Sequence, residues 1–432
     1  MTALLFLACL ISVPEDVTEF DLSNGIHVVS RTVPGGDVEG ISVFFTGGSR
    51  LLHSENQGIE AFALEAAMTG SVRYPDEMWR DIMDLTLARW TATFNYDYSR
   101  YHLKCLSEDL PLLLDGFADC LINPALDPAA VARVRDSQTA SASAEMENPD
   151  SRIWLVANRG FMGEGHPYML RPEGYPGTLS SFTAEDARQW LSGRVKSGNI
   201  VITHAGPTGA QDLRALLETT FGLIPQGGDE TPSLPEFSIS KDTLVQEHDE
   251  TLTAYLVVKF NAPPAGHSDL AAYSTACSVI SELMWQVLRT DNALTYAASA
   301  GATNSYARNW GYMYVSTPEP VLAAELMTGI FRRVASGDIE QELVTGVAGK
   351  QRTLQGIRAQ SMDTQCLMLG SGYISSGDWR SAYKLQESFT DISVKEAAEA
   401  LSGWAGNAGW GIIADSSLVN MREVETLPLR GE

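Results

Sequence analysis

The chain has few of the side chains that most often carry metal or covalent chemistry, with five cysteines and seven histidines in 432 residues. The cysteines are odd in number and lack C-x-x-C spacing, which argues against both a disulfide framework and a cysteine zinc site. We expect most of them to be small buried apolar groups: Cys9, Cys105, Cys120, Cys277 and Cys366. No two histidines are four or five residues apart, so H-E-x-x-H and its inverted form are both absent. G-x-S-x-G, P-loop and dinucleotide fingerprints are also missing, which leaves little support for an enzyme of another chemistry.

Basic residues are scarce, because 30 Lys and Arg stand against 54 Asp and Glu, a formal net charge of −24. Nucleic acid and anionic membrane surfaces would repel such a chain, so we exclude them as partners. A cationic peptide or a basic partner would suit this charge, although solubility alone also accounts for it. Hydrophobic residues make up 44% and charged residues 19%, as in soluble globular proteins, and the length predicts two or more domains.

Long apolar runs are missing too. The notable stretch, residues 2–13 (TALLFLACLISV), is about a dozen residues long and too short to span a bilayer. It is similar to the apolar part of a signal peptide but has no basic residue before it. We therefore predict that residues 1–15 are a signal segment or an N-terminal strand. The corresponding location is periplasmic or exported, with the cytoplasm as the alternative.

The chain repeats itself with an offset near 207 to 210 residues. The closing units match best: residues 181–193 (SFTAEDARQWLSG) and then GNIVITHAG correspond to residues 388–403 (SFTDISVKEAAEALSG) and then GWGIIAD. A long polar helix is predicted in each half, at about residues 128–147 and 340–362. Strand and helix patterns mix without strict alternation, which indicates an α+β sandwich in each half. We predict two homologous domains over residues 16–226 and 238–432, joined by a linker at 227–237.

One predicted helix, residues 58–70, has an unusual face. Its apolar stripe consists of Ile59, Phe62, Ala63, Ala66 and Ala67. At roughly 100° per residue, three other residues share the opposite face: Ala61, Leu64 and Glu65.

Several short segments, from about Phe20 to Asp415, follow one another in an order and spacing that resemble the insulinase-like (pitrilysin) metallopeptidase family. These segments are Asn24-Gly-Ile, Gly48-Ser-Arg, Asn56-Gln-Gly-Ile, Leu110 to Pro124, Asn148-Pro-Asp and Gly165-His-Pro-Tyr. The resemblance implies two homologous α+β domains that enclose a cavity for an extended peptide.

In that family, the positions of Ala61, Leu64 and Glu65 hold two histidine zinc ligands and the glutamate that activates water. A further Glu ligand precedes the Asn-Pro pair by eight or nine residues, where this chain has Ala140 and Ser141. The resemblance therefore implies that the zinc site is lost and that this chain holds no cofactor. We expect Glu65 to be a solvated helix carboxylate, with a cation or peptide-amine contact as the alternative. In the same way, we expect His166 to be a structural turn residue.

The second half departs from this pattern of loss. Arg289 and Tyr296 stand seven residues apart after the predicted helix at 269–288, and they look like the Arg/Tyr pair that the family's C-terminal domain presents to the catalytic cleft. A guanidinium can hold a carbonyl or carboxylate by two hydrogen bonds, and a phenol can donate to an oxyanion. The alternative is that Arg289 caps a helix and that Tyr296 begins a strand.

These residues lead to two hypotheses. In the first, the chain is a non-catalytic subunit of a two-chain zinc metallopeptidase, which supplies Arg289 and Tyr296 to a zinc-bearing homologous partner and helps to enclose an extended peptide. In the second, it is a purely structural or peptide-binding homologue without a role in proteolysis. A homodimer remains open in either case. Neither hypothesis expects peptidase activity from the chain alone.

Overall fold

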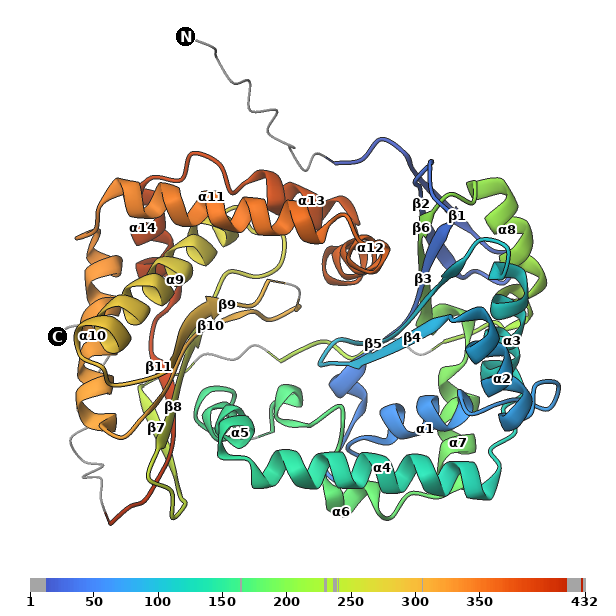
Figure 1. Ribbon diagram of the computed structural model, residues 1–432, viewed down its shortest axis with the longest axis horizontal. Helices are drawn as coiled ribbons and strands as arrows, with labels where there is room; N and C mark the ends of the chain where they lie inside the picture. Colours follow the sequence, from blue (N-terminus) through green and yellow to red (C-terminus); the bar gives the residue numbers. More distant parts are fainter. Residues whose placement is uncertain are drawn as a thin grey trace, which may run out of the picture.

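The computed structural model describes residues 13–163, 165–228, 231–235, 239, 241–304, 306–417 and 429. Over these residues the chain forms two lobes, each built on one β-sheet with helices packed against it (Figure 1). The predicted α+β fold with two similar halves is confirmed. Residues 1–12, which include Cys9 and most of the predicted signal segment, lie outside the described residues. Across the described residues, no helix combines the length and the apolar composition needed to cross a bilayer.

The first lobe contains a six-stranded sheet with the strand order β1-β2-β6-β3-β5-β4. Its strands are β1 (Val17–Asp21), β2 (His27–Thr32), β3 (Val38–Thr46), β4 (Arg89–Phe94), β5 (Tyr98–Leu106) and β6 (Ile200–Gly206). The α-helices in this part of the chain are α1 (Ile59–Ala67), α2 (Asp76–Thr86), α3 (Leu110–Ile122), α4 (Pro128–Glu147), α5 (Pro149–Phe161), α6 (Pro176–Leu179), α7 (Ala184–Arg194) and α8 (Ala210–Thr219). Short 3-10 turns are η1 (Gly48–Leu51), η2 (Pro167–Met169), η3 (Ser197–Asn199) and η4 (Phe221–Leu223). Strands β3 and β6 are buried along almost their whole length, because helices cover both faces at the sheet centre.

The second lobe contains a five-stranded sheet with the strand order β7-β11-β8-β10-β9. Its strands are β7 (Thr243–His248), β8 (Ala254–Asn261), β9 (Ala297–Ala302), β10 (Trp310–Thr317) and β11 (Ala408–Ala414). The helices are α9 (Leu270–Met284), a π-helical turn η5 (Trp285–Asp291), α10 (Pro320–Ser336), α11 (Gln341–Arg358), α12 (Met362–Ser376), α13 (Arg380–Glu387) and α14 (Val394–Trp404). The two polar helices predicted at 128–147 and 340–362 are thus α4 and α11.

The two sheets have the same topology, which supports the predicted duplication. The order β2-β6-β3-β5-β4 in the first lobe matches β7-β11-β8-β10-β9 in the second, and β1 is an additional edge strand. The outer pair is parallel in both lobes, β2 with β6 and β7 with β11, whereas the remaining pairs are antiparallel. A repeated mixed sheet of this kind follows directly from two copies of one sequence unit.

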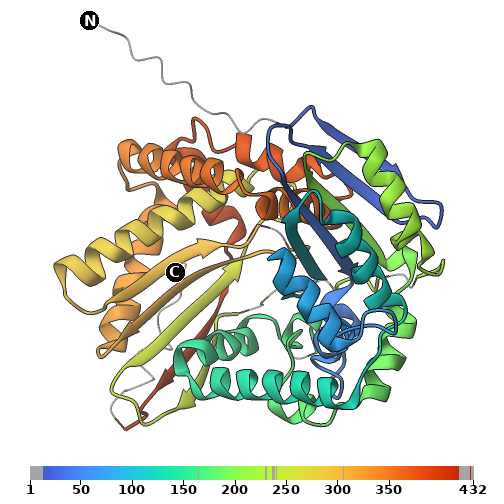
Figure 2. The ribbon, with the colours of Figure 1, turned by 45° about the vertical axis from the view of Figure 1, so that its right-hand side comes forward.

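The lobes exchange one helix each. Helix α5 packs on β7, β8 and β11 of the second sheet, and α12 packs on β3 and β6 of the first (Figures 1 and 2). Each exchanged helix has its own N-cap, since the Asn148 side chain accepts from the Asp150 N–H at 3.0 Å and the Ser361 hydroxyl accepts from the Thr364 N–H at 3.1 Å. The predicted boundaries at 226 and 238 divide the chain linearly, whereas the packing crosses that division.

Glycines allow these helices to approach the sheets closely. A Cβ at Gly411 on β11 would lie 2.5 Å from the Ala157 nitrogen on α5, and one at Gly370 on α12 would lie 2.2 Å from the Phe44 ring. Because real Cβ contacts are not this short, a larger residue would push the helix off the sheet.

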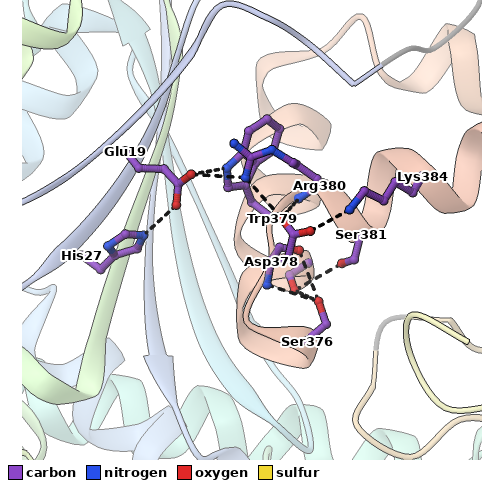
Figure 3. A network of polar contacts seen from close by, with 9 residues as sticks. Glu19, His27, Ser376, Asp378, Trp379, Arg380, Ser381 and Lys384 are labelled. Carbon is purple, nitrogen blue, oxygen red and sulfur yellow. Dashed lines mark hydrogen bonds and ion pairs between the residues drawn. The ribbon is translucent and has the colours of Figure 1, made fainter.

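A polar network joins β1, one edge strand of the first sheet, to the turn between α12 and α13 (Figure 3). The Glu19 carboxylate accepts from Trp379 Nε1 at 2.8 Å and lies 3.6 Å from His27 Nε2. On the helical side, Asp378 pairs with Lys384 at 2.9 Å and with Arg380 at 3.3 Å. The two lobes therefore also contact each other through charged and aromatic groups at the rim.

The described cysteines agree with the prediction. All four are free and buried, and they are Cys105, Cys120, Cys277 and Cys366. Burial raises the pKa of each of these thiols, as expected for packing groups rather than nucleophiles.

Candidate functional site

Helix α1, which carries the predicted degenerate zinc positions Ala61, Leu64 and Glu65, is buried on nearly all sides. Ala61 is 2% exposed and Leu64 is 1% exposed, so the face opposite the apolar stripe is not open to solvent. The helix packs against α7 and α4, which cover that face. It begins after Gly58, whose φ of 89° is left-handed, and a Cβ there would lie 2.7 Å from the Gly174 Cα.

Glu65 is half-buried rather than solvated, and the prediction of a solvent-facing carboxylate was wrong. Its Oε2 accepts from Gln138 Nε2 of α4 at 2.8 Å. Burial raises the pKa of the Glu65 carboxyl, and the hydrogen bond from Gln138 only partly opposes this. The prediction failed because sequence periodicity cannot show which neighbouring helix covers a face.

Helix α4 presents different residues to α1 than the count from Asn148-Pro149 indicated. Ala140 and Ser141 are exposed, whereas Gln138 reaches Glu65 and Ala142 is buried in the first core. Gln138 and Ala142 are four residues apart and thus share one helix face. None of these four residues carries an imidazole, thiolate or carboxylate, so they supply no zinc ligand.

The residues around α1 do not fit a zinc ion. Zinc needs about three imidazole, thiolate or carboxylate ligands, and Glu65 is the one such group among Ala61, Leu64, Glu65, Gln138 and Ala142. Across the part of the chain that the structure describes, no group of three or more His, Cys, Asp or Glu side chains could hold a metal ion.

A buried charged group next to these positions was not predicted from the sequence. Glu60 lies 3.2 Å from Arg194 Nε of α7, and its other oxygen accepts from the Ser99 hydroxyl of β5. Burial raises the pKa of Glu60 despite the opposing effects of Arg194 and Ser99. The signal for it was a second acid, besides Glu65, within an otherwise apolar helix, because a buried charge needs a partner. The pair ties α1 to its neighbours and offers no open coordination position.

His166 is a turn residue, as predicted. Its Nδ1 accepts from the Tyr168 N–H at 3.1 Å at the start of η2, and burial lowers its pKa to about 4. A neutral imidazole in this position caps a turn and is not presented to solvent.

Arg289 and Tyr296 lie on the surface of the second lobe. Arg289 is in the π-helical turn η5, where its guanidinium stacks 3.9 Å from the ring centroid of Trp285. Tyr296 is 90% exposed and precedes β9 directly, while Trp285 is 45% exposed. No hydrogen bond within the described residues joins Arg289 to Tyr296. The structure therefore exposes Tyr296 and leaves Arg289 partly buried, and it does not join them into a site within the described residues.

Two family models match the chain. Residues 27–162 match "Insulinase (Peptidase family M16)", and residues 181–348 match "Peptidase M16 inactive domain". Together the matches span most of the chain and both lobes.

Individual relatives are distant in sequence. An "Uncharacterized zinc protease" of Rickettsia felis is 23% identical over 390 residues, which cover 87% of this chain and 92% of the relative. The bovine "Cytochrome b-c1 complex subunit 1, mitochondrial" is 24% identical over 62% of this chain and 56% of its own length. The Caenorhabditis elegans "Mitochondrial-processing peptidase subunit beta" is 24% identical over 52% and 48% respectively. The chain thus aligns with only about half the length of the last two.

A solved structure shows the same fold. A protease from Helicobacter pylori superimposes with a TM-score of 0.83 at 16% sequence identity, covering 92% of this chain and 99% of that one. The family matches, the repeated sheet topology and this likeness agree with one another, and the chain belongs to the insulinase-like peptidase family M16.

Proposed function

We propose that this chain is a non-catalytic subunit of a two-chain metallopeptidase, in which a homologous partner carries the zinc ion. The observation that carries the proposal is the filled face of α1. Ala61 and Leu64 are packed into the core, and Glu65 is hydrogen-bonded to Gln138, so this face of α1 offers no position for metal-activated water.

The second lobe supports a role in trans for Arg289 and Tyr296. Tyr296 is almost fully exposed, and stacking on Trp285 holds the Arg289 guanidinium at the surface. Tyrosine and arginine are enriched on surfaces that bind a partner or a peptide. In a partner's active site, the phenol would donate to the oxyanion of the scissile carbonyl and the guanidinium would hold a substrate carbonyl.

An extended peptide could also bind to this chain through its main chain. Strand β4 is the edge strand of the first sheet opposite to β1. It pairs with β5 on one side and has mostly exposed side chains. A free strand edge can accept a further strand by main-chain hydrogen bonds, which place little demand on peptide sequence. The enclosed peptide would then be shared between the two subunits.

The names of two relatives are those of subunits of larger assemblies, and they support two different roles for this chain. One is called a subunit of a processing peptidase and the other a subunit of a cytochrome complex. The second name keeps the structural alternative open, in which Arg289 and Tyr296 have no role in proteolysis. A homodimeric peptide binder is the remaining form of that alternative.

The test is to purify this chain with a zinc-motif homologue from the same source and to assay each chain alone and mixed on a quenched peptide library. Activity that appears on mixing, and falls about 100-fold in Tyr296→Phe or Arg289→Ala, supports the proposal, because losing one oxyanion donor has an effect of that size. Arg188→Ala, at an exposed arginine on α7, is the matched control. A stable complex whose turnover ignores both substitutions would favour the structural alternative.

A further inference from the structure

The outer face of helix α2, in the first lobe, is both apolar and acidic. At roughly 100° per residue, five exposed side chains share this face: Glu77, Met78, Asp81, Asp84 and Leu85. Met78 is 49% exposed and Leu85 is 85% exposed, so the described residues leave this apolar surface uncovered. The inner face of α2 is anchored instead, because Trp79 is buried and packs against Gly116 of α3.

The carboxylates of the α2 face have no counter-ions. Across the described residues, no ion pair or side-chain hydrogen bond is formed by Glu77, Asp81 or Asp84. The neighbouring Arg80 pairs with Asp76 at 3.1 Å on its own helix. An exposed apolar face with unpaired negative charge suits a partner surface that combines apolar side chains with positive charge.

The second lobe has a surface of this kind on α11. The exposed stripe of the helix follows the i, i+3, i+4, i+7, i+8 pattern: Lys350, Thr353, Leu354, Ile357 and Arg358. Leu354 is 53% exposed and Ile357 is 60% exposed. Lys350 pairs at the surface with Glu282 at 3.1 Å, and Arg358 forms no ion pair with a described residue. Residues 343–358 contain no Asp or Glu, although the chain has 54 of them.

The two faces match in length as well as in chemistry. Residues 77–85 and 350–358 each span nine residues, or about 12 Å of helix. Within one chain, α2 and α11 belong to different lobes and lie apart from each other (Figures 1 and 2). Two copies of a chain with a net charge of −24 repel each other, except where a basic surface of one copy meets an acidic surface of the other.

We propose that two copies of this chain form a two-fold dimer in which α2 of each copy packs on α11 of the other. The apolar side chains of the two faces pack together, and the α2 carboxylates meet Lys350 and Arg358. A two-fold axis makes both contacts equivalent, so the dimer contains the contact twice. The buried area is thereby doubled, towards the roughly 800 Å² per partner of a stable interface. This dimer goes beyond the proposed function and needs no zinc-bearing partner.

The experiment is sedimentation velocity of the purified chain and of two charge-reversed variants, over about 1 to 100 µM. One variant is Asp81→Lys with Asp84→Lys on α2, and the other is Lys350→Glu with Arg358→Glu on α11. Each variant places like charges across both contacts of its own dimer, so we expect the Kd to rise at least about tenfold. An equal mixture of the two variants should dimerise like the unmodified chain, because its two contacts each join opposite charges.

The matched control is Asp136→Lys with Glu147→Lys on α4, at exposed carboxylates outside both faces. It changes the net charge by the same amount as the α2 variant and should dimerise at least as well as the unmodified chain. Thermal melts establish that each variant is folded. A chain that stays monomeric throughout, a dimer that survives either reversal, or variants that remain monomeric when mixed would overturn the proposal. Because no other chain is present, the result is independent of the two-chain activity assay.

Discussion

Lys259, on β8 in the second lobe, predicts an unusual dependence of stability on pH. Its ammonium group is buried and makes no ion pair with a carboxylate of the described residues: it donates to Asn158 Oδ1 of α5 and lies 4.8 Å from the Trp310 ring centroid. Burial lowers the pKa of Lys259 from its ordinary value of 10.5 to about 7. The Trp310 and Trp154 rings favour the charged form, but each by only about 0.5–2 kcal/mol.

The direction of this pH dependence follows from how many protons the folded and the unfolded chain bind. Between about pH 7 and 10.5, unfolded chains hold the Lys259 proton and folded chains release it, so stability rises with pH in that window. Below about pH 7 both states are protonated, and folding bears the full cost of burying the charge. A difference of roughly 3.5 pKa units corresponds to about 5 kcal/mol, which is an upper limit because the rings offset part of it.

Lys259→Met should therefore be more stable than the unmodified chain near pH 7, even though Asn158 loses a donor at a cost of about 1–3 kcal/mol. That advantage should shrink by up to about 1.4 kcal/mol per pH unit as the pH rises towards 10. Urea unfolding at pH 7, 8 and 9 measures it, with Lys104→Met on an exposed position of β5 as the control. Parallel pH profiles for the Lys259 variant and the unmodified chain would refute the reasoning.

Three further outcomes are expected. Gly411→Ala should destabilise the chain by about 1–3 kcal/mol in urea unfolding, because its Cβ would lie 2.5 Å from the Ala157 nitrogen, whereas Gly403→Ala, with open space around its Cβ, should not. Glu65→Gln should raise the melting temperature at pH 7 and leave it unchanged near pH 4: burial raises the pKa of Glu65, so the cost of burying its charge begins above the ordinary pKa of 4.5 and is complete above the raised pKa. An unchanged melting temperature at both pH values would contradict this. The purified chain should hold substoichiometric zinc by metal analysis, and a chelator should leave its melting temperature unchanged.

The sequence predicts those parts of the fold that depend on local signals and on repetition. The closing units of the two halves contain matching helix starts, in which Thr183 and Asp186 form a capping box and Ser393 and Glu396 form another. Each is followed by a helix and a buried central strand of its sheet. Because these signals lie within a few residues of one another and occur twice, the duplicated α+β architecture could be predicted from the sequence.

Features that depend on contacts between distant segments could not be predicted in this way. Which sheet α5 and α12 pack on depends on which sheet face is free. Neither helix has a sequence pattern that indicates the sheet on which it packs. The Glu60–Arg194 pair joins residues 134 positions apart, and the covering of Glu65 by Gln138 joins residues 73 apart. Glu65 was therefore placed correctly on the helix but wrongly in solvent.

The repeated contact between a glutamine and the first helix of each lobe bears on how the proposed loss of a zinc site leaves the fold intact. Gln138 with Glu65 and Gln351 with Ser278 join corresponding helices at the same sequence separation. The contact between these helices thus belongs to the packing framework of the duplicated unit. In the first lobe, Ala61 and Leu64 add buried apolar surface to that framework, and Glu60 adds an ion pair with Arg194. Since apolar side chains in a core need no compensating ligand, replacing metal ligands there removes a cost of burying polar groups and leaves the helix held on all sides.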